Sequence, residues 1–406
     1  MSDHPALLRM DTLSAFLLPL PSSLWMITVS VTPRSRFDTK GLGRAALSTL
    51  ATTLAFLSVD PLVLLGAWVI STVLFLSALR APQHRSAFRA ATSYLSVSTL
   101  LFAAGVVLLA LPNDVGGTRE QAAIGLVTVA ILIRKAILPF HAWLPHVFDR
   151  GRIGPAVLFS APQLGSYAAI VLVVPRASPG MLEFVAILSL LTTVHGAILA
   201  LAQRDVRRAC GYLFISQSAL VLAGASCANV DTIAASLLIW LASALSFTGI
   251  ARCVLMLEAR RGRLDLSQYH GGYEQMPSLA TSFLVLGLSC TGFPGTLGFV
   301  GEELLVEGSV KNFPILGLFV VAMGAFTGLA VLRIYFSLFC GRRHSGVRLP
   351  LLTREVLAFA AVASVLLGLG LAPRPVLSMG VEVGRSLAES RPRAAPAVEK
   401  SGPIEQ

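Results

Sequence analysis

The residues best placed to do chemistry are two cations, Arg134 and Lys135, which stand side by side in an apolar run that Pro139 interrupts. A charge near the centre of a membrane-spanning helix costs roughly 2.5–3.5 kcal/mol on insertion scales. Such a pair needs water or polar protein groups beside it. A pathway for ions is therefore the first hypothesis, and both residues are candidates for a proton path.

A second apolar run is interrupted at Pro294 and Gly295, inside a glycine-rich stretch that ends at Glu302 and Glu303. Backbone groups freed inside a membrane must be satisfied by protein or by water in a cavity. Two broken helices in comparable places are typical of transporters built from inverted repeats. The alternative is that Pro139 and this glycine-rich stretch simply end two helices.

The composition indicates a chain that lives in a bilayer. Hydrophobic residues make up 55% and charged residues 13%, whereas soluble domains carry about 25% charged residues. The net charge of +11 comes from arginines in short loops between apolar runs, which indicates an orientation signal rather than nucleic-acid binding. The five cysteines are scattered singly, and nothing resembles a metal, cofactor or catalytic site.

Apolar segments long enough to cross about 30 Å recur along the chain. The pattern predicts an all-α polytopic membrane protein of about twelve helices. They are expected at 12–31, 44–59, 61–80, 91–111, 122–140, 154–174, 182–202, 209–228, 231–257, 279–300, 312–340 and 355–371.

Cations gather in alternate loops, which predicts the orientation of the chain. The cation-rich loops contain Arg34, Arg36, Lys40, Arg44, Arg80, Arg85, Arg89, Arg150, Arg152, Arg204, Arg207, Arg208, Arg260, Arg261, Arg263, Arg342, Arg343 and Arg348. The positive-inside rule places this side in the cytoplasm. We therefore expect a multi-pass protein of the inner membrane with both termini on the non-cytoplasmic side, and with no cleaved leader.

Three ordered motifs resemble a known family. They are Pro-Phe-His-Ala-Trp-Leu-Pro at 139–145, Ala-Gln-Arg-Asp-Val-Arg-Arg at 202–208 with Ile-Ser-Gln at 215–217, and the glycine-rich stretch at 292–302. Together they are similar to the antiporter-like membrane subunits of respiratory complex I, most of all the M-type chain. Those subunits are related to multisubunit Na⁺/H⁺ antiporters and membrane-bound hydrogenases.

The resemblance covers about residues 10–370 and implies a domain plan. It implies two inverted five-helix repeats, each with one broken helix. The expected parts are 1–43 with one helix and a cytoplasmic loop, 44–174 and 182–340 as the repeats, 355–371 as the last helix, and 373–406 as a disordered tail.

The chain departs from the family at its charged positions. The family carries a membrane glutamate after a tryptophan, but here Val69 follows Trp68. The family lysine that pairs with this glutamate falls on Arg134, and arginine cannot release its proton in the working pH range. Lys135 could substitute if it faces the same cavity, although one residue turns a side chain by about 100° around a helix.

In the second repeat Phe247 stands where the family has a lysine. The resemblance leaves His195 and Glu302 as further proton-path candidates, with Gln163 and Gln217 as polar relays. The alternative for His195 is a hydrogen-bonded packing histidine. The alternative for Glu302 is a helix-capping carboxylate at the interface.

The resemblance implies a proton-conducting, antiporter-like subunit of a complex I-like NADH:quinone oxidoreductase or a related ion-translocating complex. Such a subunit moves protons or Na⁺, has no catalytic site or cofactor of its own, and assembles with other membrane subunits. Two alternatives remain open. One is a degenerate structural subunit that no longer conducts, and the other is the membrane partner of a bicarbonate-uptake complex.

Overall fold

The computed structural model describes residues 7–32, 39–111, 117–310, 314–341 and 351–389. Within these ranges the chain is helical, and β-structure is limited to two isolated bridges, Leu8 with Ser58 and Asp205 with Asp265. Several cations that set the expected orientation, among them Arg34, Arg36 and Arg348, lie outside the described residues. The all-α prediction is confirmed.

The helices follow one another along the chain with short connections. The first half contains α1 (Thr12–Leu17), α2 (Pro19–Val31), α3 (Thr39–Leu57), α4 (Pro61–Ala78), η2 (Pro82–His84), α5 (Arg85–Ala110), α6 (Thr118–Arg134), η3 (Phe140–Ala142), α7 (Trp143–Arg150), α8 (Ile153–Ser160), α9 (Leu164–Ala168) and the π-helical turn η4 (Ala169–Val173). The second half contains α10 (Pro179–Ala202), α11 (Val206–Ser226), α12 (Val230–Arg261), α13 (Pro277–Cys290), α14 (Leu297–Ser309), α15 (Pro314–Phe339), α16 (Thr353–Leu371) and α17 (Arg374–Glu389).

Nine helical stretches in the described part of the chain are long and apolar enough to cross a membrane. They are Thr12–Val31, Pro61–Ala78, Pro82–Ala110, Ile153–Val173, Pro179–Ala202, Val206–Ser226, Val230–Arg261, Pro314–Phe339 and Thr353–Leu371. The polytopic prediction therefore agrees with the structure, while the total of twelve stays a prediction.

The first broken helix ends earlier than the sequence suggests. We expected a helix over 122–140, but α6 stops at Arg134, and Ala136 takes a left-handed backbone with φ of 56°. The indole N–H of Trp143 donates to the carbonyl of Ile133, 3.0 Å away, an oxygen that also accepts the backbone N–H of Ala136 at the break. Pro139 thus follows the break rather than causing it.

A further helix is broken where we expected a continuous one over 154–174. Helix α8 ends at Ser160, and α9 begins at Leu164 after Pro162 and Gln163. Proline has no backbone N–H to donate, and Gln163 takes a left-handed backbone with φ of 48°. The predicted span is present as Ile153–Val173, but it is broken inside, and the break brings a polar side chain to the interior.

The break between α13 and α14 lies where the sequence predicts one. The connection runs from Thr291 to Thr296 and contains Pro294. Gly292 and Gly295 both have positive φ values, 65° and 88°, which glycine adopts at little cost. The glycines here thus permit the sharp change of direction between two half-helices.

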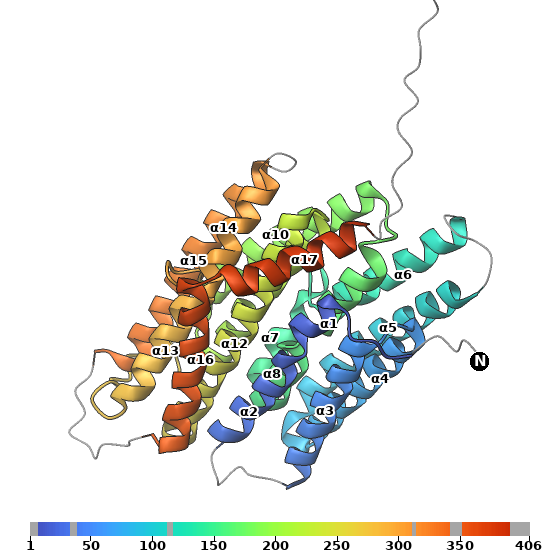
Figure 1. Cartoon of the computed structure of the whole chain (residues 1–406). Helices are drawn as coiled ribbons and strands as arrows, with labels where there is room; N and C mark the ends of the chain where they lie inside the picture. Colours follow the sequence, from blue (N-terminus) through green and yellow to red (C-terminus); the bar gives the residue numbers. More distant parts are fainter. Residues whose placement is uncertain (1–6, 33–38, 112–116, 311–313, 342–350, 390–406) are drawn as a thin grey trace, which may run out of the picture.

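Helices α11 and α12 form the centre of the molecule. The spanning segment of α11 is wholly buried, whereas α5, α15 and α16 expose large apolar side chains such as Leu100, Leu318 and Leu371. In Figure 1, α12 lies between the N-terminal helices in blue and the C-terminal helices in orange. Polar groups on α11 and α12 are therefore kept away from lipid by protein on all sides.

The expected disordered tail at 373–406 is wrong over its first part. Residues 374–389 form α17, which crosses α12 at a steep angle (Figure 1). Gly380 lies against Ala234 and Leu238, and Gly384 lies against the backbone of Val230. These small residues allow close packing, which the Pro/Ala/charge composition of the tail concealed. Residues 390–406 lie outside the described part of the chain.

Candidate functional site

The side chain of Lys135 is buried and makes three hydrogen bonds. Its ammonium nitrogen donates to Gln163 Oε1 at 2.9 Å, to Ser166 Oγ at 2.5 Å and to Ser218 Oγ at 2.8 Å. Only 4% of the residue is exposed. An ammonium group has three N–H donors, so every donor finds an acceptor. All three acceptors are uncharged.

The broken helices explain why these groups converge. Lys135 caps the end of α6, where the chain leaves the helix. Gln163 and Ser166 stand at the break before α9 and are themselves hydrogen bonded at 3.1 Å. Gly165 provides the space, because a Cβ atom there would lie 2.8 Å from Lys135 Cγ. Ser218 completes the set from the buried helix α11.

The neighbouring Arg134 points to different partners. Its guanidinium donates to Thr72 Oγ1 and Ser71 Oγ, both at 2.8 Å. It also lies between two aromatic rings, 4.2 Å from the centroid of Trp68 and 4.3 Å from that of Phe159. Aromatic faces attract a cation electrostatically. Arg134 and Lys135 therefore do not share one set of partners, and Lys135 does not simply replace Arg134.

Hydroxyl groups on α4 contact Arg134 where the family resemblance implies a carboxylate. Val69, at the position of the family glutamate, is 37% exposed, whereas Trp68 is fully buried. In the described ranges no ion pair involves Arg134 or Lys135. Both cations are thus held by neutral groups.

His195 lies beside a second histidine. The rings of His141 and His195 are 5.0 Å apart, edge to face. His141 belongs to η3 beyond the first break, and the backbone N–H of Leu138 donates to Thr192 Oγ1 at 3.1 Å. Within the described residues, His141 Nδ1 and His195 Nε2 are buried without a hydrogen-bond partner. Helix α10 therefore packs against the first break through a histidine pair.

Glu302 lies at the other predicted break. Its carboxyl group rests against Gly292, since a Cβ atom on that glycine would overlap it. Glu303, the next residue, is exposed. The structure thus directs Glu302, and not Glu303, toward the connection between α13 and α14.

Gln217 on α11 contacts a different helix from the one that Ser218 contacts. Its Nε2 donates to the sulfur of Met323 on α15 at 3.5 Å, and the Thr327 hydroxyl contacts the same sulfur at 3.3 Å. Ser216 donates to the carbonyl of Thr193 on α10 at 2.7 Å. Three consecutive residues of α11 therefore contact three different helices, which places α11 between the two halves of the protein.

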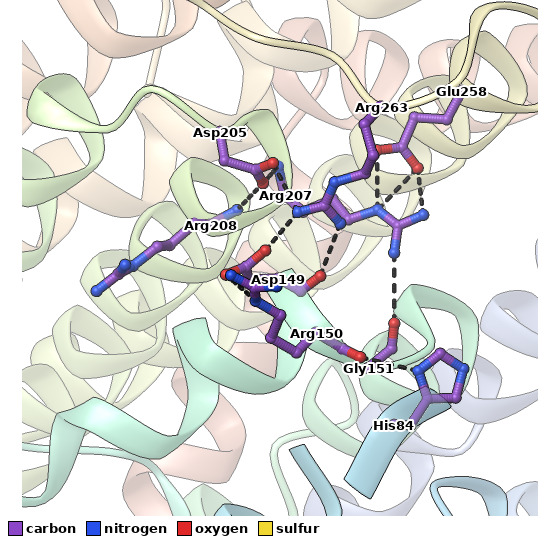
Figure 2. Close-up of polar contacts among 9 residues, drawn as sticks. All are labelled: His84, Asp149, Arg150, Gly151, Asp205, Arg207, Arg208, Glu258 and Arg263. Carbon is purple, nitrogen blue, oxygen red and sulfur yellow. Dashed lines mark hydrogen bonds and ion pairs between the residues drawn. The ribbon is translucent and has the colours of Figure 1, made fainter. Parts of the chain in front are cut away.

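An ion-pair cluster joins the helix ends at the cation-rich side (Figure 2). The Arg207 side chain on α11 donates to both oxygens of Glu258 on α12, with Nε distances of 2.8 and 2.7 Å. Arg263 contacts Asp149 and, at 2.7 Å, Asp205. These contacts support an anchoring role for Asp205 and Arg207, which the sequence reading placed in a cytoplasmic loop.

Two loop residues at this end of the bundle, Arg263 of the cluster and Asp265, have shifted pKa values. Partial burial by itself lowers the pKa of Arg263, but the carboxylates of Asp205 and Asp149 outweigh it, and the net shift is upward. The Ser267 backbone N–H donates to Asp265 and holds the pKa of that carboxyl below its usual value. Both shifts favour the charged forms, as expected for charges that pair or accept hydrogen bonds.

Sequence reasoning missed several of these groups. Ser166 lies three residues after Gln163, on the same helix face, and Ser218 directly follows Gln217. The buried Arg252 was also missed. It is the only lysine or arginine between residues 232 and 257 of an apolar segment, and this isolation is the signal that could have identified it. His141 is part of the Pro-Phe-His-Ala-Trp-Leu-Pro motif, which is the signal that could have found it.

Lys135 is a buried lysine among neutral acceptors, and it lies where broken membrane helices meet. This arrangement is typical of membrane proteins that transport ions. The family of NADH:quinone oxidoreductase and Mrp antiporter membrane subunits matches residues 91–328. This match covers more than half of the chain. The chain therefore belongs to this family of antiporter-like membrane subunits.

Curated relatives carry names from the same family. The chain is 27% identical over 257 residues to NADH-quinone oxidoreductase subunit M of Mycobacterium tuberculosis, covering 62% of this chain and 46% of the relative. It is 29% identical over 305 residues to subunit N of a Parafrankia species, covering 70% of this chain and 57% of the relative. The chain thus spans about half the length of the curated relatives it matches.

Solved structures share the fold over nearly the whole chain. A chain of the Mrp complex from a Dietzia species matches with a TM-score of 0.85 at 18% identity, covering 94% of this chain and 84% of that one. A chain of respiratory complex I from Thermus thermophilus matches with a TM-score of 0.84 at 21% identity, covering 94% and 85%. At these identities the likeness concerns the fold, and it agrees with the polytopic helical prediction.

Proposed function

We propose that this chain is a proton-conducting, antiporter-like subunit in which Lys135 binds and releases the transported proton. The observation that carries the proposal is the set of three neutral partners around its ammonium group. No carboxylate fixes the charge of Lys135 in the described part of the protein. The hydroxyls of Ser166 and Ser218 can rotate and donate to a neutral amine, so they suit both protonation states.

We further propose that the path continues across α11. Gln217 stands beside Ser218 and reaches α15, so α11 carries polar groups toward both halves of the bundle. Glu302 at the α13–α14 break and the pair of His195 and His141 are the other titratable groups at broken helices. A proton would move between them through water, because their side chains make no direct chain of contacts.

The wider assembly is part of the same proposal. The relatives are named as subunits of NADH-quinone oxidoreductase, and the matching structures are titled as a multisubunit antiporter and complex I. By analogy we propose other membrane subunits as partners, the inner membrane as the location, and both termini on its non-cytoplasmic side. We also propose residues 44–174 and 182–340 as inverted repeats, supported by the broken helix after Arg134 in the first and the break between α13 and α14 in the second.

One observation favours a second function, a structural subunit that does not conduct. Arg134 occupies the position of the family lysine and is held by two hydroxyls and two aromatic rings. A guanidinium keeps its proton at all working pH values. If the path needs a titratable group at that position, transport is blocked there and the chain serves assembly alone.

Proton flux in the assembled complex, reconstituted into vesicles, separates the two functions. The test compares Lys135→Gln with Arg134→Gln, two substitutions of adjacent buried cations that each remove one charge. The proposed function predicts that Lys135→Gln lowers the flux at least tenfold while the complex still assembles. Loss of a general acid–base group commonly costs a factor of 100 or more.

Two controls make the result decisive. Complex assembly is measured for both variants by size-exclusion chromatography, so that lost flux is not confused with lost protein. Normal flux in an assembled Lys135→Gln complex would contradict the role of this lysine. Wild-type flux in both variants, together with failed assembly when this chain is left out, would favour the structural function.

A further inference from the structure

A cavity of about 470 Å³ lies at the cation-rich end of the bundle, and Lys135 is not among its lining residues. Residues of α2, α3, α4, α8 and α12 line it, together with the segment around Gly151. Its volume is within the range of small-molecule sites in proteins. The proton path described above does not use it.

Cations line this cavity, and carboxylates do not. The lining includes His84, Arg44, Arg152, Arg207 and Arg252, with no aspartate or glutamate among the described lining residues. Among these groups, Arg207 binds Glu258 and the carbonyl of Gly151, and His84 contacts the carbonyl of Arg150 (Figure 2). They hold one wall of the cavity in place.

Arg252 is the deepest of these cations. It stands nine residues before the end of α12, which is about 14 Å along the helix axis. It is 4% exposed, and its Nη2 donates to Thr28 Oγ1 at 2.9 Å. Its Nε is buried without a hydrogen-bond partner in the described residues. A buried guanidinium with an N–H group that lacks an acceptor favours a compensating anion or polar ligand.

The same cavity has an apolar wall. Leu74 and Phe75 of α4 and Leu158 and Phe159 of α8 line it, with the rings of Phe75 and Phe159 stacked 4.2 Å apart, and Leu255 lies one helical turn from Arg252. A ligand that satisfies both walls has an anionic head and a hydrocarbon part. The cavity also lies at the end of the bundle where basic pockets between membrane helices bind lipid head groups.

We propose that this cavity binds the phosphate group of an anionic phospholipid, with Arg252 and Arg152 as the cations that contact it. The guanidinium fork matches a phosphate oxygen pair with two parallel hydrogen bonds. The first part of an acyl chain then lies against Leu74 and Leu158. Arg152 is exposed at the mouth of the cavity, where a head group enters.

Native mass spectrometry of the full chain in detergent, with titrated lipid, tests this site. The probes are dioleoyl phosphatidylglycerol, dioleoyl phosphatidylcholine and inorganic phosphate. The wild-type chain is expected to bind phosphatidylglycerol at least tenfold more tightly than phosphatidylcholine. Arg252→Gln and Arg152→Gln are each expected to weaken phosphatidylglycerol binding about tenfold, as for lost charge-assisted hydrogen bonds.

A matched control is Arg85→Gln, which removes an exposed arginine at the same end of the bundle but outside the cavity lining. Its phosphatidylglycerol affinity is expected to equal that of the wild type. If all three variants lose affinity equally, the attraction is general and the site is wrong. Arg152→Gln keeps the test valid if Arg252→Gln fails to fold, because Arg152 is exposed.

Two further measurements distinguish a phospholipid from other possible occupants of the cavity. Inorganic phosphate that binds as tightly as phosphatidylglycerol and displaces it would assign the cavity to a free oxyanion and overturn the lipid proposal. The same titration on the assembled complex excludes a third occupant. Lipid bound to the isolated chain but absent from the complex would mean that a partner subunit fills the cavity.

Discussion

At the residue scale, the most informative contrast is between Arg134 and Lys135. The two side chains diverge because one helical step turns them by about 100°, and because α6 ends between them. Arg134 reaches hydroxyls on α4, while Lys135 reaches a glutamine and two serines on α8–α9 and α11. We therefore propose different roles for them, a fixed charge for the arginine and a transferable proton for the lysine.

Gly292 offers a residue-scale prediction. An alanine there must adopt a φ of 65° and also overlap the Glu302 carboxyl group. Gly292→Ala is expected to lower the free energy of unfolding by about 2–4 kcal/mol, through backbone strain and a displaced carboxylate. Equilibrium unfolding in mixed micelles gives this value.

The matched control is Gly295→Ala, where φ is also positive but the nearest atom to the new Cβ is Leu371 Cδ2 at 3.9 Å. It is expected to cost only the backbone strain, about 1 kcal/mol. The extra cost at Gly292 should disappear in a Glu302→Ala background. Equal costs at both glycines, unaffected by Glu302→Ala, would show that the carboxyl group does not occupy the break.

The sequence predicted part of this site and missed part, for physical reasons. Charged residues within apolar runs are costly, so Arg134, Lys135 and Glu302 were visible without any structure. Ser166 and Ser218 were not, because a hydroxyl in a membrane helix is cheap when it bonds its own backbone. Only the fold shows that these two hydroxyls face a lysine instead.

At the element scale, the buried pair of Arg207 and Glu258 holds α11 against α12. The Glu258 side chain is 2% exposed and that of Arg207 is 14% exposed. Removing one partner of a buried ion pair leaves the other charge uncompensated. Glu258→Ala is therefore expected to destabilise the protein by about 3–5 kcal/mol, measured by unfolding in mixed micelles.

The comparison for this prediction is Arg150→Ala, which breaks the pair with Asp149. The Arg150 side chain is 66% exposed, so water screens the interaction. The expected cost is at most about 1 kcal/mol. Similar costs for the two variants would mean that Glu258 does not stabilise the contact between α11 and α12.

Element positions and the break between α13 and α14 were predictable, whereas the break between α8 and α9 was not. Apolar length alone located α4, α10 and α15, because crossing a bilayer requires about 20 apolar residues. The break at Gln163 depends on one Pro-Gln step inside an otherwise apolar run. Helix α17 was missed because it packs on α12 through Gly380 and Gly384. Glycines do not stand out in a sequence as an apolar helix face.

At the scale of the whole molecule, the fold brings the buried polar side chains of the proposed path to the central helices. The buried helices α11 and α12 lie at the centre, and the broken helices bring Lys135 to α11. The family membership rests on residues 91–328, which include both Lys135 and the break before Glu302. The part of the chain with a shared ancestry is thus the part that contains the proposed path.

The central claim is that Lys135 transfers a proton and does not merely supply a charge. Lys135→Arg keeps the positive charge but removes the ability to release a proton. Proton flux through the reconstituted complex is the measurement, with assembly verified for each preparation. We predict that Lys135→Arg and Lys135→Gln both lower the flux at least tenfold. Flux at the wild-type level in an assembled Lys135→Arg complex would contradict the claim.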